Sequence, residues 1–122
     1  MLLLRRQSRL ICSISKKMGN KTDWVEAQIK GNKVVVFSKT YCPFCDMAKK
    51  ALAEVGLSDY LLYELDNRDD GEEIMDILKR ITGGRTVPRV FIGGKFVGGG
   101  SEVRDFQKSG ELVSMLKSAG AL

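Results

Sequence analysis

Two cysteines, Cys42 and Cys45, are separated by two residues and follow a strongly apolar stretch. Positions i and i+3 lie on one side of a helical turn, so the two sulfurs can approach bonding distance. Pro43 suits the first helical position, because proline has no N–H to leave unpaired and its φ is fixed. The spacing therefore predicts a dithiol at the N-terminus of a helix, where a disulfide can form and break.

The two cysteines are expected to differ in reactivity. Cys42 lies at the helix start, where free backbone N–H groups and the positive end of the helix dipole stabilise a thiolate. Lys39, three residues earlier, adds a positive charge. Cys45 lies one turn further along and should be more shielded. Cys42 is therefore predicted to attack disulfides, and Cys45 to resolve the resulting intermediate.

A zinc site and a structural disulfide are the other uses of this spacing. The chain has three cysteines and no histidine, so a structural zinc site would lack its remaining ligands. A disulfide across so small a loop would add little stability. The absence of histidine also excludes a Ser-His-Asp triad and a Cys-His pair. Redox chemistry is the favoured interpretation, with no metal expected on the chain.

A second group of candidate residues, Thr86, Val87 and Pro88, precedes a predicted hairpin. Pro88 cannot donate to a strand ladder, and a cis bond before it would place the backbone of Val87 beside the sulfurs. The N–H and C=O of Val87 would then be available to an extended peptide. A Val-Pro dipeptide alone is more often only a turn, but its occurrence together with the cysteine pair favours a functional role.

A third group is the glycine run Gly98–Gly100 with Ser101 and Glu102 after it. Bare backbone N–H groups at a helix start can hold a carboxylate. The alternative is a flexible loop with Ser101 as the helix N-cap, because serine is a common cap. Taken alone, the run favours that alternative.

The strands that must position these residues follow from the apolar pattern. Residues 34–37 are β-branched and aromatic, as in a strand buried on both faces, and residues 60–65 form a second strand. Residues 90–92 and 95–97 read as a hairpin, because the Gly93-Gly94 turn between them tolerates positive φ.

Helical periodicity predicts five helices around these strands. They cover 23–30 with Thr22 as N-cap and Gly31 as stop, the segment from Pro43 to Gly56, the segment around Ile74–Ile81, and two segments after Gly100. The order of elements implies an α/β fold with a central four-stranded mixed sheet and helices on both faces.

Composition fits one globular domain of 122 residues, with 43% apolar and 29% charged residues. The formal net charge is +5, but residues 1–17 hold five basic residues and no acidic one. The rest of the chain therefore has 15 residues of each sign. A neutral domain argues against a nucleic-acid surface, and no apolar run is long enough to span a membrane as a helix.

Residues 1–17 are predicted to be a basic N-terminal extension before a domain over 18–122. The extension contains serine and lacks acidic residues, which suits a mitochondrial or plastid transit peptide. A secretory signal fits less well, because basic residues interrupt the apolar ones. A non-targeting extension, or a start at Met18, is the alternative. The predicted location is mitochondrial, cytoplasmic or both.

Together these segments closely resemble the glutaredoxins. The matching segments are Lys39–Cys45, Arg85–Pro88 with Val90–Gly94, Gly98–Ser101 and Ser109–Leu112, within residues 20–122. Thioredoxins proper would show Trp-Cys-Gly-Pro-Cys instead. The resemblance implies a thioredoxin-like fold and glutathione-dependent reduction of protein–glutathione mixed disulfides and protein disulfides. Glutathione would be the co-substrate, the partners would be glutathionylated or disulfide-containing proteins, and the chain would be a monomer.

The resemblance also implies a groove for glutathione. Lys39 would face the glycine carboxylate, and Val87 would pair with the cysteinyl backbone. Gly100 and Ser101 would offer N–H groups to the γ-glutamyl carboxylate. The remaining groove residues would be Phe44, which flanks the active sulfur, Thr86 and Pro88.

The chain departs from the family pattern at three positions. Met75 lies eleven residues before Thr86, where Gln or Arg often contacts the glycine carboxylate. That contact then falls to Lys39, alone or with another basic residue. Gly100 and Glu102 stand where Cys and Asp are frequent, so a site of regulatory oxidation is absent at position 100.

The resemblance leaves one alternative function, a dimer that holds a [2Fe–2S] cluster through two Cys42 thiolates and two glutathiones. Some dithiol glutaredoxins do this, chiefly those with a small residue where Pro43 stands, and a stiff proline should disfavour it. The presence of Cys45 separates the chain from the single-cysteine Cys-Gly-Phe-Ser class associated with cluster transfer.

Overall fold

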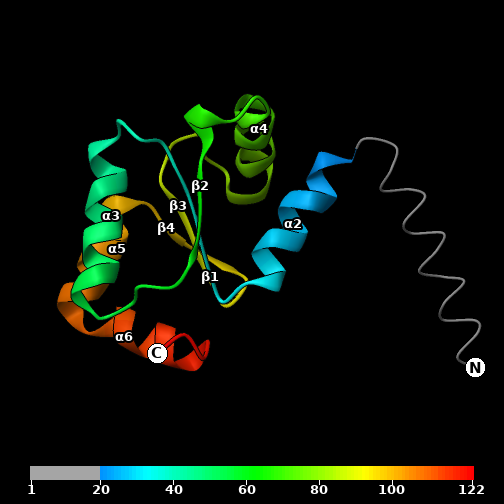
Figure 1. Cartoon of the computed structure of the whole chain (residues 1–122). Coiled ribbons are helices and arrows are strands. Elements are labelled where there is room, and N and C mark those ends of the chain that lie inside the picture. Colours follow the sequence, from blue (N-terminus) through cyan, green and yellow to red (C-terminus); the bar gives the residue numbers. More distant parts are fainter. Residues whose placement is uncertain (1–19) are drawn as a thin grey trace, which may run out of the picture.

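The computed structural model describes residues 20–122. The predicted extension 1–17 lies outside these residues. The described part is an α/β structure in which helices cover both faces of one sheet (Figure 1). Within residues 20–122, no helix has the length and apolar character needed to cross a membrane.

The sheet has four strands in the order β2-β1-β3-β4. The central strand β1 (Val34–Ser38) pairs in parallel with β2 (Leu61–Glu64) and antiparallel with β3 (Arg89–Ile92). The hairpin partner of β3 is β4 (Lys95–Gly98). This is the mixed sheet that the sequence predicts, and both turn glycines of the hairpin have positive φ as expected.

The helices divide into two layers (Figure 1). One layer contains α2 and α4, and the other contains α3, α5 and α6. Their bounds are Lys21–Gly31 for α2, Pro43–Glu54 for α3, Gly71–Thr82 for α4, Gly100–Ser109 for α5 and Glu111–Ser118 for α6. A short 3-10 turn, η1, covers Leu65–Asn67.

Strand β1 lies between two hydrophobic cores. Val34 and Val36 pack with α3, α5 and α6, whereas Val35 and Phe37 pack with α2 and α4. Every residue of the strand is buried. The continuous apolar run therefore reflects burial on both faces, and it fixes where the chain leaves the sheet to form the loop before Cys42.

Two element boundaries differ from the prediction. The N-cap of α2 is Asn20, whose side chain accepts from the N–H of Asp23 at 3.4 Å. The prediction of Thr22 as N-cap was wrong, because Thr22 lies inside the helix and its hydroxyl accepts from Arg80 at 3.0 Å. The second strand is also shorter than predicted, because Leu65 begins the η1 turn.

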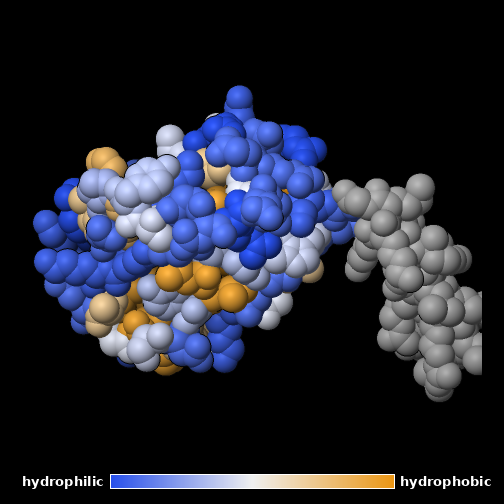
Figure 2. Space-filling view, turned by 45° about the horizontal axis from the view of Figure 1, so that its top comes forward, coloured by the Kyte–Doolittle hydropathy of each residue, from blue (hydrophilic) through white to orange (hydrophobic). Residues whose placement is uncertain are grey.

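The apolar side chains are mostly enclosed by the two cores. Figure 2 shows a largely hydrophilic face with hydrophobic residues gathered in a limited patch. Among the larger apolar side chains left exposed are Tyr41 at 71% and Phe44 at 53%, on either side of Cys42 in the sequence. The two most exposed aromatic side chains of the described residues therefore flank Cys42.

Candidate active site

The reactive pair lies at the start of α3. Cys42 is the N-cap, Pro43 is the first helical residue, and the N–H of Cys45 donates to the Cys42 sulfur at 3.3 Å. A backbone N–H directed at the sulfur, at the positive end of the helix dipole, is placed to stabilise a thiolate. The predicted position of Cys42 is thus what the structure shows, and its thiol is only half-buried.

Cys45 differs from Cys42 in its surroundings. It is fully buried in α3. Burial raises the pKa of the Cys45 thiol to about 11, although hydrogen bonding to the Ser38 side chain acts in the opposite direction. Hydrogen bonding to Cys42 and the charge of Cys42 raise the pKa of Cys45 further. The predicted shielding of Cys45 is therefore present, and at neutral pH this residue is a thiol.

Occupation of Cys42 changes that balance. A Cys42 sulfur that is part of a mixed disulfide carries no charge, so its electrostatic effect on the pKa of Cys45 is lost. Burial, which is the largest cause of the raised pKa, persists. Cys45 thus becomes easier to deprotonate once Cys42 holds a partner, although its thiolate is still a minor species at neutral pH.

The loop before β3 approaches the cysteines as predicted. The Val87–Pro88 bond is cis, and the Cys42 thiol donates to the Val87 carbonyl at 3.6 Å. Arg89 was not among the predicted site residues, but its guanidinium donates to the carbonyl and hydroxyl of Thr86 at 2.8 and 3.0 Å. Arg89 therefore fixes the loop that carries Val87.

The start of α5 forms the other side of the site. Its N-cap is Gly99, whose N–H donates to the Glu102 carboxylate at 2.7 Å, so the interpretation of Ser101 as the N-cap was wrong. Gly100 and Ser101 occupy the first turn, where backbone N–H groups have no partner within the helix. A Cβ at Gly100 would collide with the Phe44 carbonyl, so glycine permits the close approach of α5 to α3.

A cavity of about 320 Å³ lies between these segments. It adjoins Cys42 through Phe44 and Val87, which belong to the helix start and the cis-proline loop. Six of the predicted groove residues line it, with Gly99 and Glu102 in addition. The six are Phe44, Thr86, Val87, Pro88, Gly100 and Ser101.

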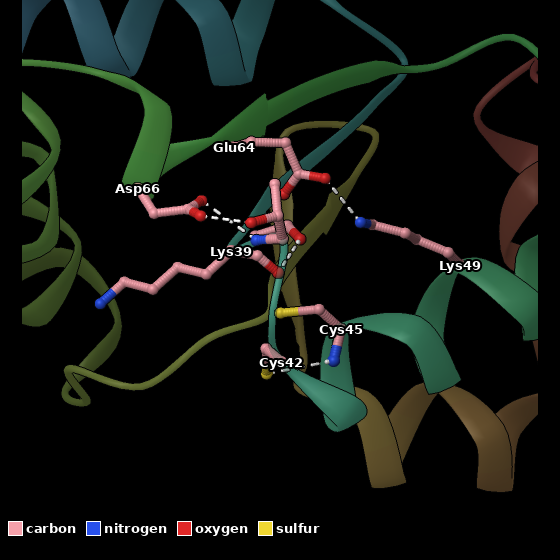
Figure 3. A network of polar contacts seen from close by, with 8 residues as sticks. Lys39, Cys42, Cys45, Lys49, Glu64 and Asp66 are labelled. Atoms are coloured by element: carbon pink, nitrogen blue, oxygen red, sulfur yellow. Dashed lines mark hydrogen bonds and ion pairs between the residues drawn. The ribbon is translucent and has the colours of Figure 1, made fainter.

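Lys39 is the predicted groove residue that does not line this cavity. Its backbone carbonyl accepts from the N–H of Cys42 at 3.3 Å. Its side chain, however, points away from both sulfurs (Figure 3). The structure thus places the Lys39 side chain neither in this cavity nor against the Cys42 sulfur.

Asp66 fixes the loop between β1 and Cys42. Its carboxylate accepts from the N–H of Thr40 at 3.0 Å and also from the Thr40 hydroxyl (Figure 3). The hydroxyl contact is the main cause of the lowered pKa of Asp66. No local sequence pattern indicates Asp66 as a site residue, because its contact joins positions 26 residues apart.

Met75 cannot take part in ligand binding, as expected. It is 2% exposed and belongs to the core beneath α4. Arg85 is a basic residue near the start of the cis-proline loop, but its guanidinium is paired with Glu72 and, at 3.0 Å, with Asp76. Among residues 20–122, no group of three or more His, Cys, Asp or Glu side chains is arranged to hold a metal ion.

Comparisons with known proteins agree with this geometry. The family model described as Glutaredoxin matches residues 34–97. A glutaredoxin from Ricinus communis is 49% identical over 94 residues, which cover 77% of this chain and 91% of the relative. Glutaredoxin-C4 from Arabidopsis thaliana is 45% identical over 98 residues, which cover 80% of this chain and 72% of the relative.

Solved structures give the same result. Oxidised glutaredoxin 2 from Chlamydomonas reinhardtii superposes with a TM-score of 0.81 at 46% identity, covering 83% of this chain and 94% of that one. A buckwheat glutaredoxin–glutathione complex gives a TM-score of 0.78 at 42% identity, covering 83% and 91%. The predicted thioredoxin-like fold is confirmed.

The raised pKa of Cys45 predicts a pH dependence for the resolving step. At pH values below its pKa the Cys45 thiol is mostly protonated. Its thiolate fraction should therefore grow up to about tenfold per pH unit between roughly pH 7 and 9. Reduced protein in which serine replaces Cys12, the third cysteine of the chain, is mixed with an aromatic disulfide whose released thiol absorbs visible light. The first release reports Cys42, and the second, which needs Cys45, should accelerate throughout this range.

The Cys45→Ser variant is the control, because it should give the first release without the second. A second release whose rate levels off below about pH 7 would contradict the environment assigned to Cys45.

Proposed function

The chain belongs to the glutaredoxin family and is a thiol oxidoreductase, and from this premise we propose that it uses glutathione to reduce protein–glutathione mixed disulfides and protein disulfides. The observation that carries the proposal is the position of the Cys42 sulfur. It lies between the N–H of Cys45 and the carbonyl of Val87, beside a cavity. A nucleophile at this position can attack a disulfide whose glutathione half occupies that cavity.

The reaction follows from the unequal cysteines. The Cys42 thiolate attacks the glutathione sulfur of a mixed disulfide, the old S–S bond breaks, and the protein thiolate leaves and takes up a proton. Cys42 then carries glutathione in a mixed disulfide, and the thiolate of a second glutathione attacks the sulfur of the bound glutathione. Glutathione disulfide forms and Cys42 is released as a thiolate. For a protein disulfide, the Cys45 thiolate instead attacks the Cys42 sulfur, and the bond from Cys42 to the substrate sulfur breaks, so that the substrate leaves as a thiolate. Two glutathiones then reduce the Cys42–Cys45 disulfide and become glutathione disulfide.

Recognition of glutathione would rest mainly on backbone groups. The similar buckwheat glutaredoxin forms a complex with glutathione, which supports the same ligand here. Val87 would pair with the cysteinyl backbone, and the free first-turn N–H groups of Gly100 and Ser101 would bind the γ-glutamyl carboxylate. The Glu102 carboxylate already accepts from the N–H of Gly99, so the ligand would bind the N–H groups of Gly100 and Ser101.

Substitution of each cysteine tests this division of labour. Cys42→Ser should abolish glutathione-dependent turnover of a glutathionylated peptide, because no other exposed nucleophile adjoins the cavity in residues 20–122. Cys45→Ser should keep substantial turnover, because a second glutathione can release the intermediate. Equal loss in the two variants would show that Cys45 is obligatory and that the proposed route is wrong.

The cluster-binding alternative has a separate signature. The chain would be purified without oxygen in the presence of glutathione and iron, and its visible spectrum and mass in solution recorded. A dimer that absorbs visible light would support a [2Fe–2S] role, whereas a colourless monomer with turnover supports the oxidoreductase role.

Lys39→Ala should raise the apparent KM for glutathione. Met75 is buried and Arg85 is already paired, so Lys39 is proposed as the main partner of the glycine carboxylate. A charge-assisted hydrogen bond of about 1.5–3 kcal/mol corresponds to a change of roughly ten- to a hundredfold. Lys95→Ala is the matched control, because Lys95 is exposed at the opposite end of the sheet. An unchanged KM in Lys39→Ala would show that another group binds the carboxylate.

The extension 1–17 is proposed to act as a mitochondrial address and to be dispensable for folding and catalysis. Its basic, acid-free composition supports this role. A chain that begins at Met18 should keep full turnover and the same Tm, and a fluorescent fusion of residues 1–20 should enter mitochondria. Diffuse cytosolic fluorescence would refute the address, and a large fall in Tm would refute the domain boundary.

A further inference from the structure

Four polar side chains meet behind the cysteine pair, where α3 covers the ends of β1 and β2. Cys45 and Lys49 are four residues apart in α3 and lie on one helix face. Ser38 and Glu64 are the last partners in the parallel pairing of β1 with β2, so their side chains share one face of the sheet. It is the face that α3 covers, because Val36, two residues before Ser38, packs in the α3 core.

An ion pair fixes the position of Lys49 in this group. Its ammonium lies 2.7 Å from one carboxylate oxygen of Glu64, and each side chain is less than a quarter exposed. Figure 3 shows Lys49 reaching from α3 toward Glu64, on the same helix as the two cysteines. The other carboxylate oxygen of Glu64 is buried and has no hydrogen-bond partner among the described residues. Glu64 therefore keeps the Lys49 ammonium in one position, next to the side of α3 that carries Cys45.

Of this pair, Lys49 is the member whose pKa an ionised Cys45 affects. Burial lowers the pKa of Lys49, but the hydrogen bond and charge of Glu64 and the negative charge of an ionised Cys45 outweigh burial and raise it. Lys49 therefore stays charged although it is partly enclosed. Ser38 is fully buried, and its hydroxyl donates to the Lys39 carbonyl at 3.3 Å. The same hydroxyl is also a hydrogen-bond partner of the Cys45 side chain.

We propose that Lys49, held by Glu64 and assisted by the Ser38 hydroxyl, stabilises the negative charge on Cys45 when this residue resolves the mixed disulfide on Cys42. The inference rests on the proposed function and adds a positioning residue to it. The Cys45 thiol first loses its proton to solvent. Its thiolate then attacks the Cys42 sulfur, the bond from Cys42 to glutathione breaks, and glutathione leaves as a thiolate that takes up a proton. The two cysteines are oxidised to a disulfide and the glutathione sulfur is reduced.

The proposal separates two routes that share Cys42. When a second glutathione releases the intermediate, Cys45 never becomes charged, and Lys49 has no role. When Cys45 releases it, a thiolate must form in a buried place, and removal of a nearby positive charge disfavours that species. Lys49 should therefore affect only the Cys45-dependent step.

The experiment follows both steps in the full chain. Reduced protein in which serine replaces Cys12, the third cysteine of the chain, is mixed with glutathione disulfide, quenched with acid at millisecond to second intervals, and analysed by intact mass spectrometry. Formation of glutathionylated protein reports attack by Cys42, and its decay to the internal disulfide reports attack by Cys45. Lys49→Met should slow the decay about tenfold, the effect of a pKa change of about one unit, and leave formation within about twofold of wild type.

Matched variants distinguish charge from structure. Lys50→Met removes a neighbouring, exposed charge of α3 and should change neither step, whereas Lys49→Arg should restore the decay. Glu64→Gln keeps an acceptor for Lys49 but removes the opposing charge, so its decay should be at least as fast as in wild type. The double variant of Lys49→Met with Glu64→Gln leaves no unpaired carboxylate and should still decay more slowly than Glu64→Gln alone, even if the Lys49→Met single variant folds poorly.

Three results would overturn the inference: an unchanged decay in a folded Lys49→Met or double variant, an equal slowing of formation and decay, or a slow decay in Glu64→Gln. Failure of the proposed function is recognisable separately, because wild-type protein would then form no glutathionylated intermediate.

Discussion

The site depends on one hydrogen bond, from the backbone N–H of Cys45 to the sulfur of Cys42. This bond begins α3, because the sulfur occupies the N-cap place that a side-chain oxygen holds in most helices. It also directs a donor at the atom that must carry negative charge. Local folding and nucleophilicity thus arise from the same contact, and a change at Cys42 alters both.

Charged side chains outside the reactive pair hold the segments around this bond. Asp66 fixes Thr40 in the loop before Cys42, and Arg89 fixes Thr86 in the loop before β3. Glu102 caps the N–H of Gly99 at the start of α5. The hydrophobic cores support the sheet and helices, and these three polar contacts fix the loops and the helix start that surround the site.

The sequence predicted the elements whose signals are local. The apolar run of β1, the hairpin glycines and the turn from Cys42 to Cys45 are all readable within a few residues. The approach of Val87 to Cys42 joins positions 45 residues apart, and it was predicted only because the Val-Pro dipeptide occurs together with the cysteine pair. Asp66 was missed because its partner Thr40 is 26 residues away and is set by tertiary packing, whereas the bond from Arg89 to Thr86 spans three residues and was not predicted from the local sequence. Two helix N-caps were also predicted wrongly. Asn20 and Thr22 are both good N-cap residues, so the local sequence does not distinguish them, and the hydrogen bond from the Gly99 N–H to Glu102 makes Gly99 the cap instead of Ser101.

The two cysteines solve one electrostatic problem in different ways. Cys42 is half-exposed and has the helix N-terminus to stabilise its charge, whereas Cys45 is buried one turn further along, where that effect has faded. Charge at Cys45 therefore needs side chains, and these come from α3 itself and from the sheet face that it covers. Strand β1 is apolar from Val34 to Phe37 and ends in the buried Ser38. A buried hydroxyl costs free energy unless it has a hydrogen-bond partner, so a serine at the end of an apolar strand fits a place where charge must form. In the proposed arrangement the helix dipole serves the attacking sulfur, and Ser38 with the Lys49–Glu64 pair serves the resolving one.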